Sequence, residues 1–194
     1  MKAYYDRRAP EYDDWWLGRG LYADSDRPGW EEERRNLERF IAELPPVRTL
    51  DVACGTGFLT RHLGGEVMAL DASARMLKLA GQQAPNARGV QGDALALPFP
   101  DEAFDRVFTS YFYCHLEAED RERFLDEARR VASELVVVAS VRGPGDPSAG
   151  WVERRLKDGS TWSVYKRVFE GPDLAGELDG EIVFSGSWFL VVRA

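Results

Sequence analysis

The stretch from residue 47 to residue 60 constrains the fold more than any other part of the chain. Its first seven residues form a mainly apolar run that suits a buried strand. Gly55 and Gly57 then interrupt the run, and helical spacing of apolar residues resumes from Phe58 to Leu63. A strand, a glycine turn and a helix in this order bring backbone N–H groups to one point. Such a point suits a negatively charged or strongly accepting ligand group, although a lone Gly-x-Gly also occurs in tight structural turns.

Acidic residues lie at the ends of this strand and of the next two predicted strands. Asp51 is near the end of the first, Asp71 follows the apolar run 67–70, and Asp93 follows a candidate strand at 87–91. Because the carboxyl ends of parallel strands meet at one edge, we expect three carboxylates where open α/β sheets bind ligands. An acidic residue about twenty positions beyond the first strand is placed to accept from ribose hydroxyls.

The motifs along this edge resemble those of a known family. The stretch from Leu50 to Gly57 resembles the first motif of class I S-adenosylmethionine-dependent methyltransferases. The stretch from Gly92 to Asp101 resembles the segment after strand three in the methyltransferase type 11-like branch, which is related to quinone-biosynthesis methyltransferases. The similarity covers roughly residues 35–140 and fades toward both ends, where such enzymes carry their substrate specificity.

The resemblance implies one α/β domain over residues 1–194, with a Rossmann-like sheet of seven strands. The strands are expected to be mostly parallel with the last antiparallel, and helices are expected on both faces. The predicted parts are an N-terminal helical lid or cap, a cofactor-binding core, an inserted β-hairpin, and a closing helix and hairpin, at residues 1–45, 46–142, 151–167 and 172–194. Periodicity and turn signals predict helices over 30–44, 118–131 and 172–178, and strands over 104–112, 135–141, 181–185 and 188–192.

The resemblance also implies S-adenosylmethionine as the cofactor. In that arrangement Gly55 and Gly57 bring the backbone against the methionine moiety, and Asp51 organises its ammonium side. Asp71 holds the ribose diol, and Asp93 with Ala94 reads the adenine. The expected cofactor-binding set is Asp51, Ala53, Gly55, Thr56, Gly57, Asp71, Ala72, Met76, Gly92, Asp93, Ala94, Ser110, Tyr5 and Tyr12.

Aromatic residues crowd the first thirty positions, in a segment otherwise rich in Asp and Arg: Tyr4, Tyr5, Tyr12, Trp15, Trp16, Tyr22 and Trp30. A disordered tail would be poor in aromatics, so the segment is expected to be ordered. It either packs as a seal on the domain edge or forms a lid over cofactor and acceptor. The resemblance favours the lid, because a leading helix of similar pattern places a tyrosine near the cofactor's carboxylate in related enzymes.

Three residues at and just beyond the end of the fourth predicted strand are candidates to border the transferred methyl group: Tyr111, Tyr113 and His115. His115 is one of only two histidines, and it acts either as a base or in shaping the pocket. An oxygen or nitrogen acceptor can require a base, whereas a thiolate, a halide or a stabilised carbanion does not. The sequence leaves the acceptor atom open.

The predicted hairpin is a candidate acceptor site. A two-residue turn at Asp158-Gly159 would place Arg155 opposite Trp162 and Trp151 opposite Lys166, all on one face. Tryptophans beside cations suit a small-molecule acceptor that is aromatic or anionic. The alternative is a solvated arm whose tryptophans pack onto the domain. The predicted acceptor-binding residues are Trp15, Trp151, Arg155 and Trp162.

Composition limits the other possibilities. A net charge of −8 and a pI near 4.9 argue against a nucleic-acid partner. Cys54 and Cys114 have no metal-ligand spacing, so we expect free thiols in a reducing cytoplasm and no bound metal. No signal peptide or membrane span is expected, and the protein is predicted to be a monomer or homodimer.

Three other functions remain open beside small-molecule methyl transfer. A nicotinamide-dependent oxidoreductase shares the glycine turn, but Thr60 replaces the third glycine of its motif and the Asp93 signal has no counterpart there. A methyltransferase-like module could bind the cofactor without turnover. An RNA or protein substrate is disfavoured by the acidic balance and by the lack of an appended recognition domain.

Overall fold

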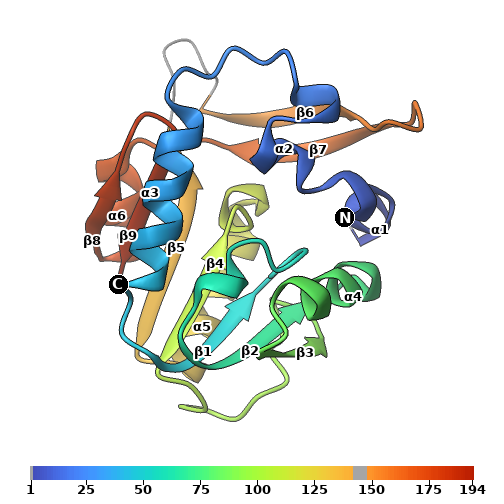
Figure 1. The fold of residues 1–194 in the computed structure, drawn as a ribbon. Coiled ribbons are helices and arrows are strands. Elements are labelled where there is room, and N and C mark those ends of the chain that lie inside the picture. The colour runs from blue at the N-terminus through green and yellow to red at the C-terminus, as the bar shows by residue number, and fades with distance from the viewer. Residues whose placement is uncertain (1, 142–147) are drawn as a thin grey trace.

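A seven-stranded sheet forms the centre of the computed structural model, which describes residues 2–141 and 148–194 (Figure 1). Its order is β3-β2-β1-β4-β5-β9-β8. The strands are β1 Val47–Val52, β2 Gly65–Asp71, β3 Ala87–Gln91, β4 Arg106–Ser110, β5 Glu134–Ser140, β8 Glu181–Ser185 and β9 Phe189–Arg193. β1 to β5 pair in parallel, whereas β9 runs antiparallel between β5 and β8. The predicted fold class is confirmed, and residue 142, where the predicted core ends, lies outside the described residues.

Helices cover both faces of this sheet. The central strands are nearly continuous apolar runs, and such runs are stable only where both of their faces are covered. On one face α5 (Ala118–Val131) and α6 (Gly171–Leu178) pack against alternate residues of the central strands. On the other face lie α3 (Trp30–Ala42) and α4 (Ala74–Gln83). Each helix directs an apolar stripe at the sheet and charged residues at solvent.

The predicted helix after the glycine turn is absent from the structure. Only a single 3-10 turn, η3 (Thr60–His62), occupies this place. The chain reaches Gly65, the first residue of β2, too soon for a longer helix. Phe58 and Leu59 still turn inward and are buried, so the apolar spacing reflects core packing and not a regular helix.

The predicted hairpin forms as a separate two-stranded sheet of β6 (Ala149–Arg155) and β7 (Thr161–Arg167), but its predicted register is wrong by one residue. The connection has three residues, 157–159, closed by a bond of 2.9 Å from Leu156 N–H to Ser160 O. Gly159 has a φ of +83°, which favours glycine in this longer turn.

The one-residue shift changes which side chains share a face. Arg154, and not Arg155, lies opposite Trp162, and Trp151 lies opposite Tyr165, and not Lys166. The predicted common face is therefore wrong. Trp162, Val164 and Lys166 lie on one face, and Trp151 and Arg155 lie on the other.

The N-terminal segment, residues 2–22, lies beside the hairpin at the carboxyl end of the sheet (Figure 1, blue and orange). It contains the short elements α1 (Lys2–Arg8), η1 (Ala9–Glu11), α2 (Asp14–Leu17) and η2 (Gly20–Tyr22). A further 3-10 turn, η4 (Tyr113–His115), follows β4. Among residues 2–141 and 148–194, no helix has the length and apolar character needed to cross a membrane.

Candidate active site

The loop after β1 forms one wall of a cavity at the carboxyl edge of the sheet. Ala53, Gly55 and Gly57 have φ values of +57°, +57° and +81°. Left-handed backbone suits the two glycines but strains Ala53, and strain of this kind is concentrated at functional sites. A Cβ on Gly55 would lie 3.4 Å from the ring of Tyr12, which is an ordinary contact, so the positive φ and not crowding favours glycine at this position.

Asp71, at the tip of β2, is held in place by backbone groups. Its carboxylate accepts from Gly55 N–H at 2.9 Å and from Ser73 N–H at 2.8 Å. Burial raises its pKa, and the two backbone bonds act against that rise. The Ser73 hydroxyl accepts from Met76 N–H at 3.1 Å and so caps α4, which places Met76 in the wall beside Asp71.

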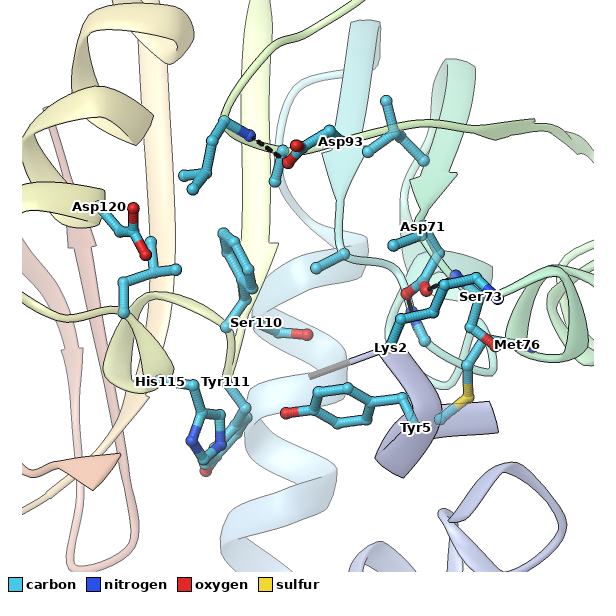
Figure 2. Close-up of a pocket in the computed structure, with 18 of the residues that line it drawn as sticks. Lys2, Tyr5, Asp71, Ser73, Met76, Asp93, Ser110, Tyr111, His115 and Asp120 are labelled. Atoms are coloured by element: carbon cyan, nitrogen blue, oxygen red, sulfur yellow. Dashed lines mark hydrogen bonds between the residues drawn. The ribbon is translucent and has the colours of Figure 1, made fainter. Parts of the chain in front are cut away.

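The larger cavity, of about 260 Å3, opens where the tips of β1, β2, β3 and β4 meet (Figure 2). Asp93 follows β3, and its carboxylate accepts from Leu95 N–H at 2.9 Å. The cavity brings together eleven of the fourteen predicted cofactor residues: Tyr5, Tyr12, Ala53, Gly55, Asp71, Ala72, Met76, Gly92, Asp93, Ala94 and Ser110.

The three remaining predicted cofactor residues do not line the larger cavity. Asp51 is 1% exposed and accepts from the Thr60 hydroxyl at 2.6 Å. Thr56 is also buried and donates its hydroxyl to Asp13. Gly57 lies close to Ala80 of α4, where an added Cβ would come within 3.0 Å of the helix backbone. All three support the loop from behind the cavity wall.

The N-terminal segment closes the larger cavity on one side. Tyr5 extends from α1 across the cavity toward Tyr111 and His115 (Figure 2). The segment is fixed to the domain by two carboxylates: Asp6 accepts from the Ser73 hydroxyl at 2.6 Å, and Asp13 accepts from the side chains of Thr56 and Gln83.

The aromatic residues of the first thirty positions divide between the two predicted roles. Tyr5 and Tyr12 line the larger cavity, as a lid would. Trp16 and Trp30 are 3% and 7% exposed and belong to the core on the α3 side, as an edge seal would. The lid therefore stays a prediction, which the positions of Tyr5 and Tyr12 support, while Trp16 and Trp30 pack in the core.

The predicted catalytic residues separate at the end of β4. Tyr111 and His115 line the larger cavity, and Tyr111 has a φ of +55° that turns the chain. That turn sends Tyr113 the other way, into the core. There it is 1% exposed and donates its hydroxyl to Glu177 of α6 at 2.7 Å. Tyr113 therefore lines neither cavity, and its hydroxyl contacts α6 instead.

His115 is held in a defined orientation. Its Nδ1 lies 2.7 Å from the carbonyl oxygen of Tyr165, and a carbonyl only accepts, so Nδ1 carries the proton and Nε2 is left as an acceptor. Burial, together with the nearby cations Lys166, Arg8 and Arg154, lowers the pKa of His115 to about 4, although the hydrogen bond to Tyr165 acts in the opposite direction. The side chain is therefore neutral at pH 7 and can accept a hydrogen bond.

The predicted acceptor residues do not form one group. Trp151 lines the larger cavity, whereas Trp15 lines a smaller adjoining cavity of about 90 Å3. Trp162 packs against Tyr4 at a ring distance of 5.9 Å, and Arg155 is exposed, so neither lines a cavity.

Sequence reasoning missed several lining residues. In the larger cavity these are Lys2, Leu70, Ser73, Leu95, Phe112, Leu116, Glu117, Asp120 and Tyr165. In the smaller cavity they include Arg8, Tyr22, Ser140 and Arg154. Ser73 had a usable signal, because a serine before the apolar spacing of α4 is typical of a helix cap. Arg8 and Arg154 had none, because only the tertiary contact of the N-terminal segment with the hairpin brings them together.

Known proteins resemble this chain in sequence and in structure. Residues 50–135 match the family described as Methyltransferase domain. The demethylmenaquinone methyltransferase of Thermotoga maritima is 35% identical over 134 residues, covering 66% of this chain and 54% of that relative. The enzyme of the same description from Thermus thermophilus is 39% identical over 158 residues, covering 76% and 66%. The chain thus spans roughly half to two thirds of the length of these relatives.

Among solved structures, the DhpI-SAM-HEP complex matches with a TM-score of 0.78 and 26% identity. The match covers 98% of this chain and 94% of that one, so it includes the N-terminal segment and the hairpin.

Proposed function

Because the chain belongs to the S-adenosylmethionine-dependent methyltransferases, we propose that it transfers a methyl group from S-adenosylmethionine to a small-molecule acceptor. The larger cavity carries this proposal, because the tips of the four neighbouring parallel strands β1 to β4 open into it beneath Tyr5 and Tyr12. When bound, S-adenosylmethionine supplies a methyl group that its sulfonium already activates. The residues of this chain then have to bind, orient and exclude water.

The residues around the larger cavity fit this cofactor. Asp71 uses each carboxylate oxygen for one backbone N–H and retains lone pairs that can accept two ribose hydroxyls. Met76, Ala94 and Leu95 give the apolar wall that an adenine ring requires, and Asp93 lies beside them to accept from its amino group. The glycine loop offers close backbone approach for the methionine moiety.

On the acceptor side, Tyr5, Tyr111 and His115 orient the incoming molecule. Because His115 is neutral at pH 7, its Nε2 accepts a hydrogen bond from the acceptor and adds no charge. The aromatic side chains suit an acceptor with a flat or apolar body. Holding donor and acceptor in line can supply on the order of 7–11 kcal/mol of the rate enhancement.

The nicotinamide alternative lacks its usual phosphate site. A dinucleotide places its pyrophosphate at the N-terminus of the helix after the glycine turn. Here that place holds the three residues of η3, which form no such helix. The larger cavity therefore favours a ligand without a pyrophosphate.

A ligand titration followed by thermal melting tests the proposal. S-adenosylhomocysteine, the demethylated product, at about a hundred times its dissociation constant should stabilise the fold by roughly 2.7 kcal/mol. For a chain of this length that raises the melting temperature by about 5–10 °C. A comparable shift with NADH and none with S-adenosylhomocysteine would contradict the proposal.

Asp71→Ala supplies the matching variant. Each charge-assisted bond contributes roughly 1.5–3 kcal/mol, so calorimetry should show at least about a tenfold loss of S-adenosylhomocysteine affinity. Asp24→Ala, at an exposed residue outside both cavities, is the control and should bind as the parent does. Turnover with any small acceptor then separates an enzyme from a cofactor-binding module.

The finer expectations stay part of this proposal: a lid at 1–45, a core at 46–142, a hairpin at 151–167 that selects the acceptor, a closing unit at 172–194, a cytoplasmic location, and a monomer or homodimer. The division into parts is supported by the fold, in which the hairpin is a sheet of its own.

A further inference from the structure

The smaller cavity adjoins the larger one but differs from it in chemistry. It lies between the N-terminal segment and the hairpin, and four side chains line both cavities: Tyr5, Tyr12, Tyr111 and His115. A single water needs on the order of 10–15 Å3 of such space. About 90 Å3 therefore accommodates a group of a few heavy atoms.

Three cations line the smaller cavity, and they come from three elements. Arg8 ends α1, Arg154 lies on β6 and Lys166 lies on β7. No Asp or Glu is among the described residues of its lining. In a protein with a net charge of −8, this gathering of positive charge among the described lining residues is a local exception.

Among the described residues, the contacts of the Arg8 guanidinium are with tyrosine side chains. The guanidinium donates to the Tyr4 hydroxyl at 2.7 Å and lies 5.0 Å from the centre of the Tyr12 ring. Burial raises the pKa of Tyr4, so this hydroxyl is neutral at pH 7 and balances no charge. Arg154 is half-buried, and neither arginine forms an ion pair with a carboxylate of the described residues.

Most other buried or half-buried arginines of the described residues pair with a carboxylate; Arg27 is an exception, because its guanidinium donates to the Trp15 carbonyl and lies over the Trp30 ring. Arg106 pairs with Glu134, Arg121 and Arg167 pair with Glu177, and Arg130 pairs with Glu127. Pairing is expected, because removing a cation from water is unfavourable unless an anion accompanies it. Arg8 and Arg154 therefore lack the kind of partner that the chain supplies elsewhere, and a bound anion would supply it.

We propose that the methyl acceptor carries a small oxyanion, a carboxylate or a phosphoryl group, and that this group binds in the smaller cavity between Arg8 and Arg154. The two arginines are specificity-determining residues, because guanidinium groups bind such oxyanions with paired N–H donors. The rest of the acceptor extends past Tyr111 and His115 into the larger cavity. This inference rests on the proposed function, since it assigns the acceptor of that reaction.

The test measures binding, so it does not require the natural acceptor. Calorimetry is carried out with S-adenosylhomocysteine saturating and ionic strength held constant. It compares three probes that share a phenyl ring and differ in the polar group: benzoate, phenylphosphonate and benzyl alcohol. The variants are Arg8→Gln and Arg154→Gln. Arg155→Gln is the matched control, because Arg155 is the next residue along β6 but is exposed on the opposite face of the hairpin.

At least one acid should bind about tenfold or more tightly than the alcohol, and the tighter of the two identifies the acid class. Arg8→Gln and Arg154→Gln should each weaken acid binding by about ten- to a hundredfold. The same variants should leave the affinity for S-adenosylhomocysteine within about twofold, and Arg155→Gln should change neither affinity. If Arg8→Gln melts early, Arg8→Lys, which keeps the charge but loses the paired N–H donors, should still weaken acid binding, though by less than Arg8→Gln.

Equal binding of acids and alcohol to the parent, or an equal loss in Arg155→Gln, would overturn the inference. Failure of S-adenosylhomocysteine to bind the parent would instead overturn the proposed function, so the two failures are distinguishable.

Discussion

Two side chains near the cavities, the buried Asp51 and the half-buried His115, are held neutral at pH values where they would ordinarily carry charge. Burial raises the pKa of Asp51 to about 7, and the hydroxyl of Thr60 offsets only part of the effect. Burial lowers the pKa of His115 to about 4. Neither group therefore places a fixed charge beside the ligands at mildly acidic pH.

The raised pKa of Asp51 predicts how stability depends on pH. The folded protein keeps the Asp51 proton up to a pH of about 7, whereas the unfolded chain loses it near its ordinary value of 3.8. The folded state therefore binds more protons in that range, and the free energy of unfolding falls as the pH rises from about 4 to about 7.

Asp51→Asn should remove this loss. We expect the variant to gain on the order of 2–4 kcal/mol relative to the parent between pH 4.5 and pH 8, measured by urea unfolding at each pH. Asp24→Asn, at an exposed position, is the control and should follow the parent. A variant with the parent's pH slope would show that Asp51 ionises normally.

The larger cavity opens at the strand tips, and short elements outside the central sheet close both cavities from the opposite side. The tip of the hairpin contacts the N-terminal segment through Arg7 and Asp158 at 2.6 Å, and Lys157 pairs with Asp14. The backbone N–H of Lys157 also donates to Glu11 at 3.0 Å. These contacts join segments more than 140 positions apart, so they fix the N-terminal segment over the cavities.

Arg7→Asp should loosen this contact, because it places a second carboxylate opposite Asp158 where the arginine stood. Exposed ion pairs contribute roughly 0.2–1 kcal/mol, so the melting temperature should change little. Amide exchange in residues 2–17 should become faster by up to about fivefold. Adding Asp158→Arg reverses both charges and should restore the slow exchange. A double variant that exchanges as fast as Arg7→Asp would contradict the pairing.

At the scale of the whole molecule, aromatic side chains join the two ends of the chain. Trp16 stacks on Phe58 at 4.8 Å and on Phe189 at 5.8 Å. Its backbone carbonyl accepts from the indole of Trp30 at 3.0 Å. The N-terminal segment is therefore anchored in the core through α2, while its first helix, α1, remains at the cavities.

Regular elements and strand tips were predictable from sequence because their signals are local. Helix α5 has the predicted bounds Ala118–Val131, and β8 has the predicted bounds Glu181–Ser185. Asp71 and Asp93 lie at one edge because parallel strands align their carboxyl ends.

The remaining errors in the predicted site have physical causes that cannot be read from local sequence patterns. One extra residue in the hairpin turn exchanged Arg155 for Arg154, and the left-handed backbone of Tyr111 turned Tyr113 into the core. Asp51 has the expected sequence position, but its side chain points behind the cavity wall toward Thr60. Each outcome depends on a local backbone conformation, which the alternation of apolar and polar residues in the sequence does not determine.

The four side chains that line both cavities predict an energetic coupling between the two ligands. Because Tyr5, Tyr12, Tyr111 and His115 line both spaces, we expect a ligand in one cavity to order part of the other before it is filled. We expect each ligand to tighten the other by about fivefold or more, and thermodynamic reciprocity requires the two factors to be equal. Calorimetry of S-adenosylhomocysteine with and without a saturating acid probe, and of the probe with and without S-adenosylhomocysteine, measures both factors. Independent binding would mean that the shared walls are already rigid in the empty protein.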